Sequence, residues 1–433
     1  MLAGSVIFAI SQWCMIILFA KLGNTAMVGH YAYAAAIAFP VSLVANLSLR
    51  AIFVNDFAGR FSFARMLGAR YLLVSVAMLV LIVIAALNRA NAEKSAAVLI
   101  VGAAMLLDSV SDSYYSLVQK YDRMDRMARS QMLRSVLSCA SVASILYVTR
   151  NLVYAVCGML VARSITLLAY DSAPEAFRIG AVGSEGREDL PDARSLRRRF
   201  APEWDFRSHM SMIWLALPLG FVNVLVSFNS NIPRYIIEHY LGPRELGIYS
   251  ALSYIPQAAI MISTTLASVT FARLSKFYFH HDVRAFRRLL GKNVLICAGL
   301  GVAAIAVSLV AGRQILSILY RPEYAEHWDL LIWLVATGGV ACVAACVGSA
   351  SVAASQFRQQ IPLFLAVTGV SAGLSFLLIP RLGLYGAAIA GLASMIVQFA
   401  GAWLIVLRAL ARRGINSPQP ETIRTPVMVA TES

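Results

Sequence analysis

Long apolar stretches fill almost the whole chain, and they decide what it can fold into. A helix needs roughly 20 mostly apolar residues to cross a bilayer, and mean hydropathy here is +0.70 with only 14% charged residues. Soluble domains carry about 25% charged residues. Lipid cannot satisfy open backbone groups, so each span should be an α-helix. We expect twelve spans, at residues 3–22, 31–54, 70–88, 95–118, 132–149, 151–170, 209–239, 246–271, 292–312, 329–354, 361–380 and 383–407.

Lysine and arginine are unequally divided between the two sides of the predicted membrane. With both termini in the cytoplasm, the inside connections carry 26 of these residues, Arg70 and Arg134 among them, and the outside connections carry 8. This bias predicts cytoplasmic termini and accounts for most of the net charge of +15. We expect contact with anionic lipids and no nucleic-acid binding, because the chain offers no soluble basic domain to hold a duplex.

The predicted helices fall into two similar halves. The segments KLGNTAMVGHYAYAAAIAFP (Lys21–Pro40) and YLGPRELGIYSALSYIP (Tyr240–Pro256) share Leu-Gly, Gly-x-Tyr and a later proline, which predicts matching bends. Six helices per half give a parallel repeat around a central lumen, a design typical of alternating access. The expected parts are an N-terminal six-helix bundle (1–170), a cytoplasmic basic linker (171–208), a C-terminal six-helix bundle (209–410) and a disordered cytoplasmic tail (411–433).

Polar residues at membrane depth are costly and mark candidate sites. The seventh span contains SFNSNIPRYIIEHYLG, with Arg234 in its outer third. Arg234 should face the lumen, where its planar fork suits phosphate, or extend outward to the interface. The alternative is a structural pair with Glu238 one turn on.

Other charges inside spans point the same way. Arg163 has no carboxylate one turn away and should face the lumen, and Arg50 is a weaker candidate near the cytoplasmic end of its span. Asp108 and Asp112 lie one turn apart on one face, where two close carboxylates favour protonation of one. They are candidates for coupling transport to a proton or sodium ion, or for salt bridges to Arg163 or Arg50.

The remaining candidates are uncharged, and no enzyme motif accompanies them. We expect them to line the lumen and hydrogen-bond cargo, although each alone also suits helix packing. They are Gln12, Asn229, Asn231, Tyr254 and Gln257. The six cysteines all fall in apolar segments; Cys342 and Cys346 share a helix face, and buried packing is favoured over a metal site. We find no nucleotide-binding loop, zinc-protease motif or nucleophile elbow, so no catalytic residue, metal or cofactor is expected.

With the twelve spans, the repeat and the segments GSVIFAISQWCMIILFAKLG and NIPRYIIEHYLGPRELGIYSALSYIP in hand, the chain resembles a known family. It is similar to the lipid-linked oligosaccharide and O-antigen (polysaccharide) flippases of the multidrug/oligosaccharidyl-lipid/polysaccharide exporter superfamily, up to about Arg413. The resemblance implies two six-helix lobes around a cationic lumen, with Arg163 and Arg234 matching the cationic feature. It also implies movement of undecaprenyl-diphosphate-linked glycans to the outer leaflet of a bacterial inner membrane, with a glycan polymerase and a chain-length regulator as candidate partners.

Three other functions are compatible with parts of the pattern. A multidrug antiporter of the same fold would use acidic residues and aromatics for cations, which Asp108 and Asp112 favour and the arginines oppose. A membrane glycan polymerase or ligase generally needs a large outside loop, and the longest one expected here spans only residues 313–328. A scaffold that recruits glycosyltransferases through the basic linker is the third. Peptidoglycan-precursor flippases usually have two helices more than the twelve predicted here, which disfavours that cargo.

Overall fold

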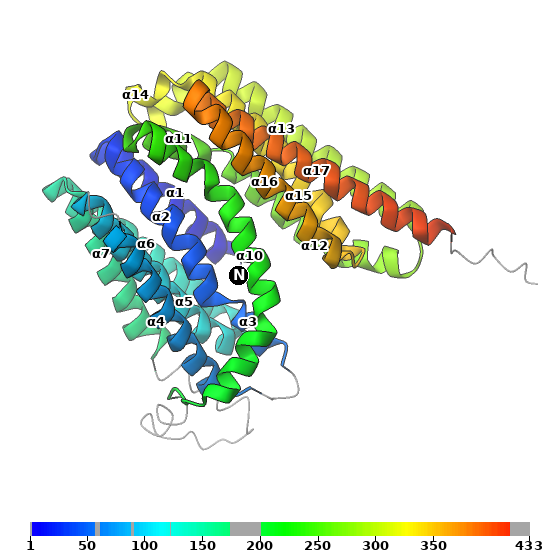
Figure 1. The fold of residues 1–433 in the computed structure, drawn as a ribbon, viewed down its shortest axis with the longest axis horizontal. Helices are drawn as coiled ribbons and strands as arrows, with labels where there is room; N and C mark the ends of the chain where they lie inside the picture. The colour runs from blue at the N-terminus through cyan, green and yellow to red at the C-terminus, as the bar shows by residue number, and fades with distance from the viewer. Residues whose placement is uncertain (1, 57–60, 88–90, 122, 174–200, 416–433) are drawn as a thin grey trace, which may run out of the picture.

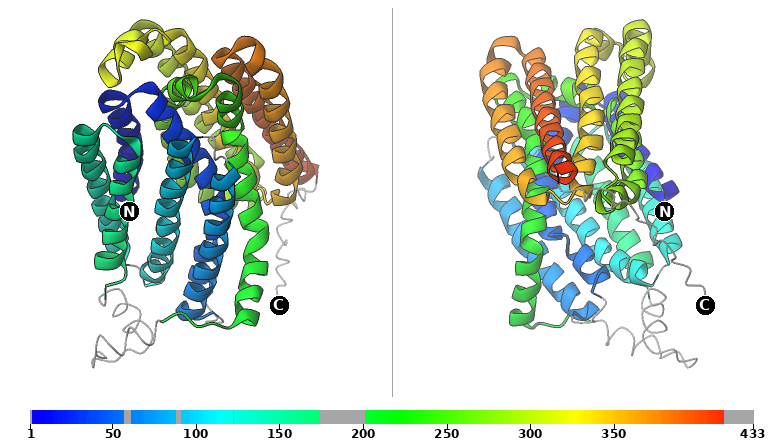
Figure 2. Two further views of the ribbon diagram at one scale, coloured as in Figure 1. Left: turned by 60° about the vertical axis from the view of Figure 1, so that its left-hand side comes forward. Right: turned by 90° about the vertical axis from the view of Figure 1, so that its right-hand side faces the viewer.

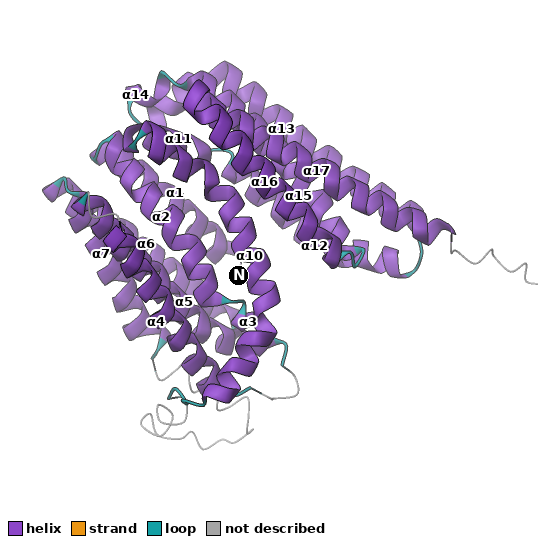
Figure 3. Ribbon diagram, in the orientation of Figure 1, coloured by secondary structure: helices purple, strands orange, loops and turns teal. Residues whose placement is uncertain are grey.

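The computed structural model describes residues 2–56, 61–87, 91–121, 123–173 and 201–415. Every regular element in these ranges is a helix (Figure 3). Ten helices of the described chain are long and apolar enough to cross a membrane. The predicted class, an all-α polytopic membrane protein, is therefore confirmed, while the count of twelve spans stays a prediction. Most of the predicted linker and tail lies outside the described residues.

The first half of the chain supplies seven α-helices and one π-helical turn. They are α1 (Leu2–Leu22), α2 (Thr25–Asn46), α3 (Leu49–Val54), α4 (Phe63–Leu87), α5 (Ala92–Lys120), α6 (Met124–Thr149), α7 (Leu152–Thr166) and η1 (Leu167–Asp171). Three of them begin at an asparagine cap, which satisfies backbone donors that the first turn leaves open. The Asn24 side chain accepts from Met27 N at 2.8 Å, and Asn91 and Asn151 do the same for α5 and α7.

The second half contains eight helices, of which α10, α13 and α17 each exceed 30 residues. They are α10 (Phe206–Leu241), α11 (Pro243–Tyr254), α12 (Gln257–Phe279), α13 (Val283–Leu319), α14 (Pro322–Ala325), α15 (Trp328–Ala353), α16 (Phe357–Leu382) and α17 (Leu384–Ile415). The predicted span 246–271 is thus two helices, because the chain breaks at Ile255–Pro256. The matching proline, Pro40, lies inside a continuous α2, which ends only at Leu47 in a left-handed conformation with φ of 39°.

The two halves meet at one end of the molecule and diverge toward the other (Figures 1 and 2). Near α11 and α14, one apolar core unites both halves, including Ile16, Val28, Leu252 and Leu331. The far ends of α4 and α6 on one side and of α12 and α17 on the other lie well apart (Figure 1). Helices α10 and α11 pack against α2, and α10 also packs against α16. The second half therefore reaches across to the first.

The repeated Gly-x-Tyr motif explains how closely α2 and α11 approach each other. A Cβ atom on Gly29 would lie 1.8 Å from the Pro243 carbonyl oxygen, and one on Gly247 would lie 2.0 Å from the Thr25 carbonyl oxygen. Any side chain at either position would force the two backbones apart. The two glycines occupy corresponding places in the two sequence repeats, so the repeat builds the contact that joins the halves.

Candidate functional site

Asp112 is the centre of one charged cluster inside the first half. On α5, its carboxylate lies 2.9 Å from Arg50 Nη1 and 3.4 Å from Arg70 Nη2. Arg50 also donates to Gln119 at 2.7 Å. Asp112 was predicted either to couple transport to an ion or to form a salt bridge with an arginine. The structure contains the salt bridge to Arg50 and adds Arg70 as a second cation.

Asp108, one turn earlier on α5, is the centre of a second cluster. Its two oxygens accept from Arg134 Nη1 at 2.9 Å and from Arg163 Nη1 at 2.6 Å. Both arginines are buried, with side chains 7% and 5% exposed. The predicted pairing of the α5 aspartates with Arg163 is therefore present. Arg163 is bound to a carboxylate instead of standing free as a cation.

Arg70 and Arg134 correct the count of basic loop residues. They were assigned to inside connections, yet both lie within helices, α4 and α6, and Arg70 is completely buried. Arg70 donates to Ser113 Oγ, Asn46 Oδ1 and the Ala45 carbonyl at 2.8–2.9 Å. The sequence does contain a signal for the burial of Arg70, its position inside the continuous apolar run MLGARYLLV. A basic residue that only sets the membrane orientation is expected outside such a run.

Asp171 is a buried acid that sequence reasoning missed. It ends the π-helical turn η1, and Ser130 on α6 donates to it while sharing a hydrogen bond of 2.8 Å with Tyr115. Arg126 donates to the neighbouring Tyr170 carbonyl at 2.8 Å. Single π turns often occur at functional positions. Its place at the predicted boundary between span and linker left no sequence pattern to single it out.

Arg234 contrasts with the arginines of the first half. It is half-buried on α10 and donates to Asn231 Oδ1 at 2.9 Å, and no carboxylate in the described residues pairs with it. The predicted alternative partner, Glu238, instead forms an ion pair of 2.8 Å with Lys94 on α5. Asn231 donates to the Ser227 carbonyl at 2.8 Å. Asn229, two residues earlier, is also buried, and its Oδ1 has no hydrogen-bond partner in the described chain. Arg234 thus keeps donors available.

The remaining predicted residues separate into different environments. Gln12 lines a small cavity together with Arg134 and Arg163. Tyr254 packs half-buried against the shared core, and Gln257 is exposed at the start of α12. The structure therefore brings Gln12 beside Arg163, which is paired with Asp108, and leaves Gln257 apart from them.

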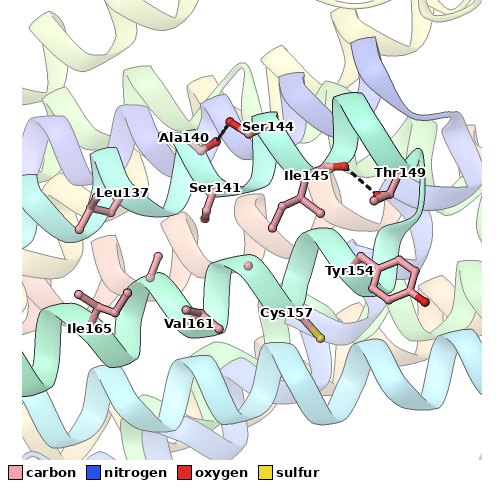
Figure 4. Close-up of a pocket in the computed structure, with 12 residues that line it drawn as sticks. Leu137, Ala140, Ser141, Ser144, Ile145, Thr149, Tyr154, Cys157, Val161 and Ile165 are labelled. Carbon is pink, nitrogen blue, oxygen red and sulfur yellow. Dashed lines mark hydrogen bonds between the residues drawn. The ribbon is translucent and has the colours of Figure 1, made fainter.

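The cysteines and a groove between α6 and α7 carry no charge. Cys346 contacts Cys297 on α13, with sulfurs 2.9 Å apart, and in the described part of the chain no group of histidine, cysteine or acidic residues forms a metal site. Between α6 and α7 runs an open, mainly apolar groove of about 670 Å³ (Figure 4). Ser144 and Thr149 beside it donate to carbonyls of their own helix. Its chemistry suits lipid chains rather than a polar headgroup.

Part of the chain matches a known protein family, and most of that part lies in the second half. Residues 193–329 match the model of a family described as polysaccharide biosynthesis protein. This matched range includes Arg234. The capsular polysaccharide biosynthesis protein CapF of Staphylococcus aureus is 23% identical over 391 residues, which are 90% of this chain and 93% of that protein. The resemblance stated from the sequence is confirmed by these matches.

Solved structures agree on the fold. An inward-facing multidrug resistance MATE family transporter of the MOP superfamily superposes with a TM-score of 0.72 at 14% identity, covering 94% of this chain and 95% of that one. The lipid II flippase MurJ in an inward closed conformation gives 0.66 at 12% identity, covering 95% and 91%. At these identities the likeness is one of fold. Together the comparisons show the fold of these membrane proteins and a sequence similarity to polysaccharide biosynthesis proteins.

Proposed function

We propose that this protein moves lipid-linked oligosaccharides, with a diphosphate between lipid and glycan, from the cytoplasmic to the outer leaflet of a bacterial inner membrane. The observation that carries the proposal is Arg234, a half-buried guanidinium on α10 with no carboxylate partner in the described residues. An arginine at membrane depth is costly, and its planar fork binds phosphate oxygens in pairs. A diphosphate would supply the missing counter-charge.

Arg163 has a different role in this proposal. Because Asp108 binds it at 2.6 Å, its guanidinium holds α5 to α7 and does not bind cargo directly. Arg50 is held in the same way by Asp112. The binding residues are therefore Arg234 with Asn229 and Asn231, and undecaprenyl diphosphate is the lipid carrier that the resemblance implies.

The arrangement of the halves supports alternating access as the mechanism. At the end where the halves meet, Trp13 on α1 donates to the Tyr320 hydroxyl at 3.0 Å, and Arg321 donates to the Lys21 carbonyl at 2.9 Å. Lys21, Tyr320 and Arg321 lie in predicted outside connections, so in this proposal the described state is closed outward and divergent toward the cytoplasm. Cargo would enter from inside, and release requires these contacts to open. Both termini would be cytoplasmic, and a polymerase and a chain-length regulator would act on the delivered glycan.

A flipping assay tests this function. Purified protein is placed in liposomes with a fluorescent undecaprenyl-diphosphate oligosaccharide, and exposure in the opposite leaflet is followed for wild type, Arg234→Ala and Arg234→Lys. A charge-assisted contact is worth about 1.5–3 kcal/mol, so flipping should fall at least about tenfold in Arg234→Ala and less in Arg234→Lys. The control is Arg244→Ala, which removes an exposed arginine paired with Glu323 at 2.6 Å and should flip normally.

Two outcomes would contradict the proposal. Normal flipping by Arg234→Ala would remove the assigned site. No flipping by wild type, together with efflux of a cationic dye that needs Asp112 and a proton or sodium gradient, would favour a multidrug antiporter. The fold likeness to a multidrug transporter makes that the second candidate, although both α5 aspartates are already bridged by arginines.

A further inference from the structure

A small polar cavity lies between α1, α6 and α7, within the first half of the molecule. It is lined by Ser11, Gln12, Met15, Arg134, Ser135, Ser138 and Arg163. Its volume is about 10 Å³, which is close to the space needed for one water-sized particle. Phosphate has five heavy atoms, so neither it nor a sugar headgroup fits. The cavity is therefore too small to hold the headgroup of the cargo.

Several lining groups are buried donors with no acceptor in the described part of the chain. They are Arg163 Nε and the hydroxyls of Ser135 and Ser138, whose side chains are at most 5% exposed. Serines in a helix commonly donate to a carbonyl one turn back. Ser141 and Ser144 on the same helix do so, at 3.0 and 2.8 Å, whereas Ser135 and Ser138 do not. Their hydroxyls thus remain available to an occupant of the cavity.

The charge around the cavity is positive. The two arginines that line the cavity, Arg134 and Arg163, share the single carboxylate of Asp108, so this group has one positive charge in excess. Asp108 occupies one Nη of Arg163 and leaves the Nε edge of that guanidinium for another ligand. Buried charge at membrane depth is costly unless it is paired. A monatomic anion would offset this excess.

We propose that this cavity binds a single halide ion, chloride under physiological conditions, held by Arg163 Nε and the hydroxyls of Ser135 and Ser138. A halide accepts from all its neighbours at once, which matches a set of converging donors. Water is the competing occupant, since it also fits. The halide site does not depend on the proposed transport function, because halide binding is measured in the absence of any cargo.

Chloride binding can be measured directly on the purified full-length protein in detergent. The probe is sodium chloride, followed by the concentration-dependent broadening of its ³⁵Cl resonance, with sodium gluconate keeping ionic strength constant. The test variant is Ser135→Ala/Ser138→Ala, which removes two donors and keeps the Asp108 ion pairs. The matched control is Ser141→Ala/Ser144→Ala on the same helix, since those hydroxyls are already satisfied by their own helix.

For wild type and the control we expect broadening of the ³⁵Cl resonance that saturates and that bromide competes away. For the test variant we expect chloride affinity at least about tenfold weaker, because two hydrogen bonds to an ion are lost. A second readout is the melting temperature, which chloride should raise relative to gluconate in wild type and control only. Absence of saturable broadening in wild type would mean that the cavity holds water, and would overturn the proposal. Equal binding by the two serine variants would overturn it as well.

Discussion

Replacing Asp112 by asparagine removes the carboxylate that two arginines share. Arg50 Nη1 and Arg70 Nη2 lie 2.9 and 3.4 Å from its oxygens, and Arg70 has no exposed surface. Asparagine keeps the shape and one acceptor, so the change removes charge and little volume. If the aspartate neutralises the arginines, the variant leaves their positive charge buried between α4, α5 and α2.

The expected cost follows from the burial of each partner. Removing one member of a buried ion pair costs about 3–5 kcal/mol. The Asp112 side chain is 28% exposed, so solvent screens part of the interaction, and we expect about 3 kcal/mol, at the lower end. Arg70 retains its bonds to Ser113, Asn46 and the Ala45 carbonyl, which limits the loss further. For a chain of 433 residues we expect the melting temperature to fall by roughly 3 °C.

The assay is the fraction of protein that stays monodisperse in detergent after heating, compared between Asp112→Asn and Asp282→Asn. Asp282 caps α13 by accepting from Ala285 N at 2.9 Å. Asparagine caps helices about as well as aspartate, so this control also loses one negative charge without losing an ion pair. A melting temperature for Asp112→Asn equal to that of the control would refute the structural role of Asp112, and would favour a titrating, ion-coupling carboxylate.

Three further substitutions test the contacts that join the helices. Gly247→Ala should destabilise the protein by about 1–3 kcal/mol, because its Cβ would lie 2.0 Å from a carbonyl oxygen of α2. The control Gly369→Ala should not destabilise the protein, since the space around its Cβ is open. Equal melting temperatures of the two variants would contradict the close crossing of α2 and α11. Lys94→Gln should lower the melting temperature by stranding the 6% exposed Glu238 carboxylate, and the second change Glu238→Gln should restore most of the loss; additive losses would argue against the pair. Asn151→Ala should cost about 1 kcal/mol through loss of the α7 cap, measured by the same heating assay, whereas Asn151→Ser should be near wild type.

The charged network shows where sequence reasoning reached its limit. Asp108, Asp112, Arg163 and Arg50 were identified as costly residues at membrane depth, because that property depends only on local hydropathy. Which aspartate pairs with which arginine depends on the rotation and height of five helices, α3 to α7, and no spacing along the chain encodes it. Arg134, counted as a loop charge, turned out to share Asp108 with Arg163.

The sequence by itself determined the class of the protein, since a bilayer imposes its demand on each span separately through length and apolarity. It also determined the repeat, including the two Gly-x-Tyr motifs. Only the tertiary structure decided that these glycines face each other across α2 and α11, that Arg234 lacks the Glu238 partner one turn away, and that a cavity with converging donors forms between α1, α6 and α7. Those features arise where helices distant in sequence meet, so they depend on packing geometry that no local pattern specifies.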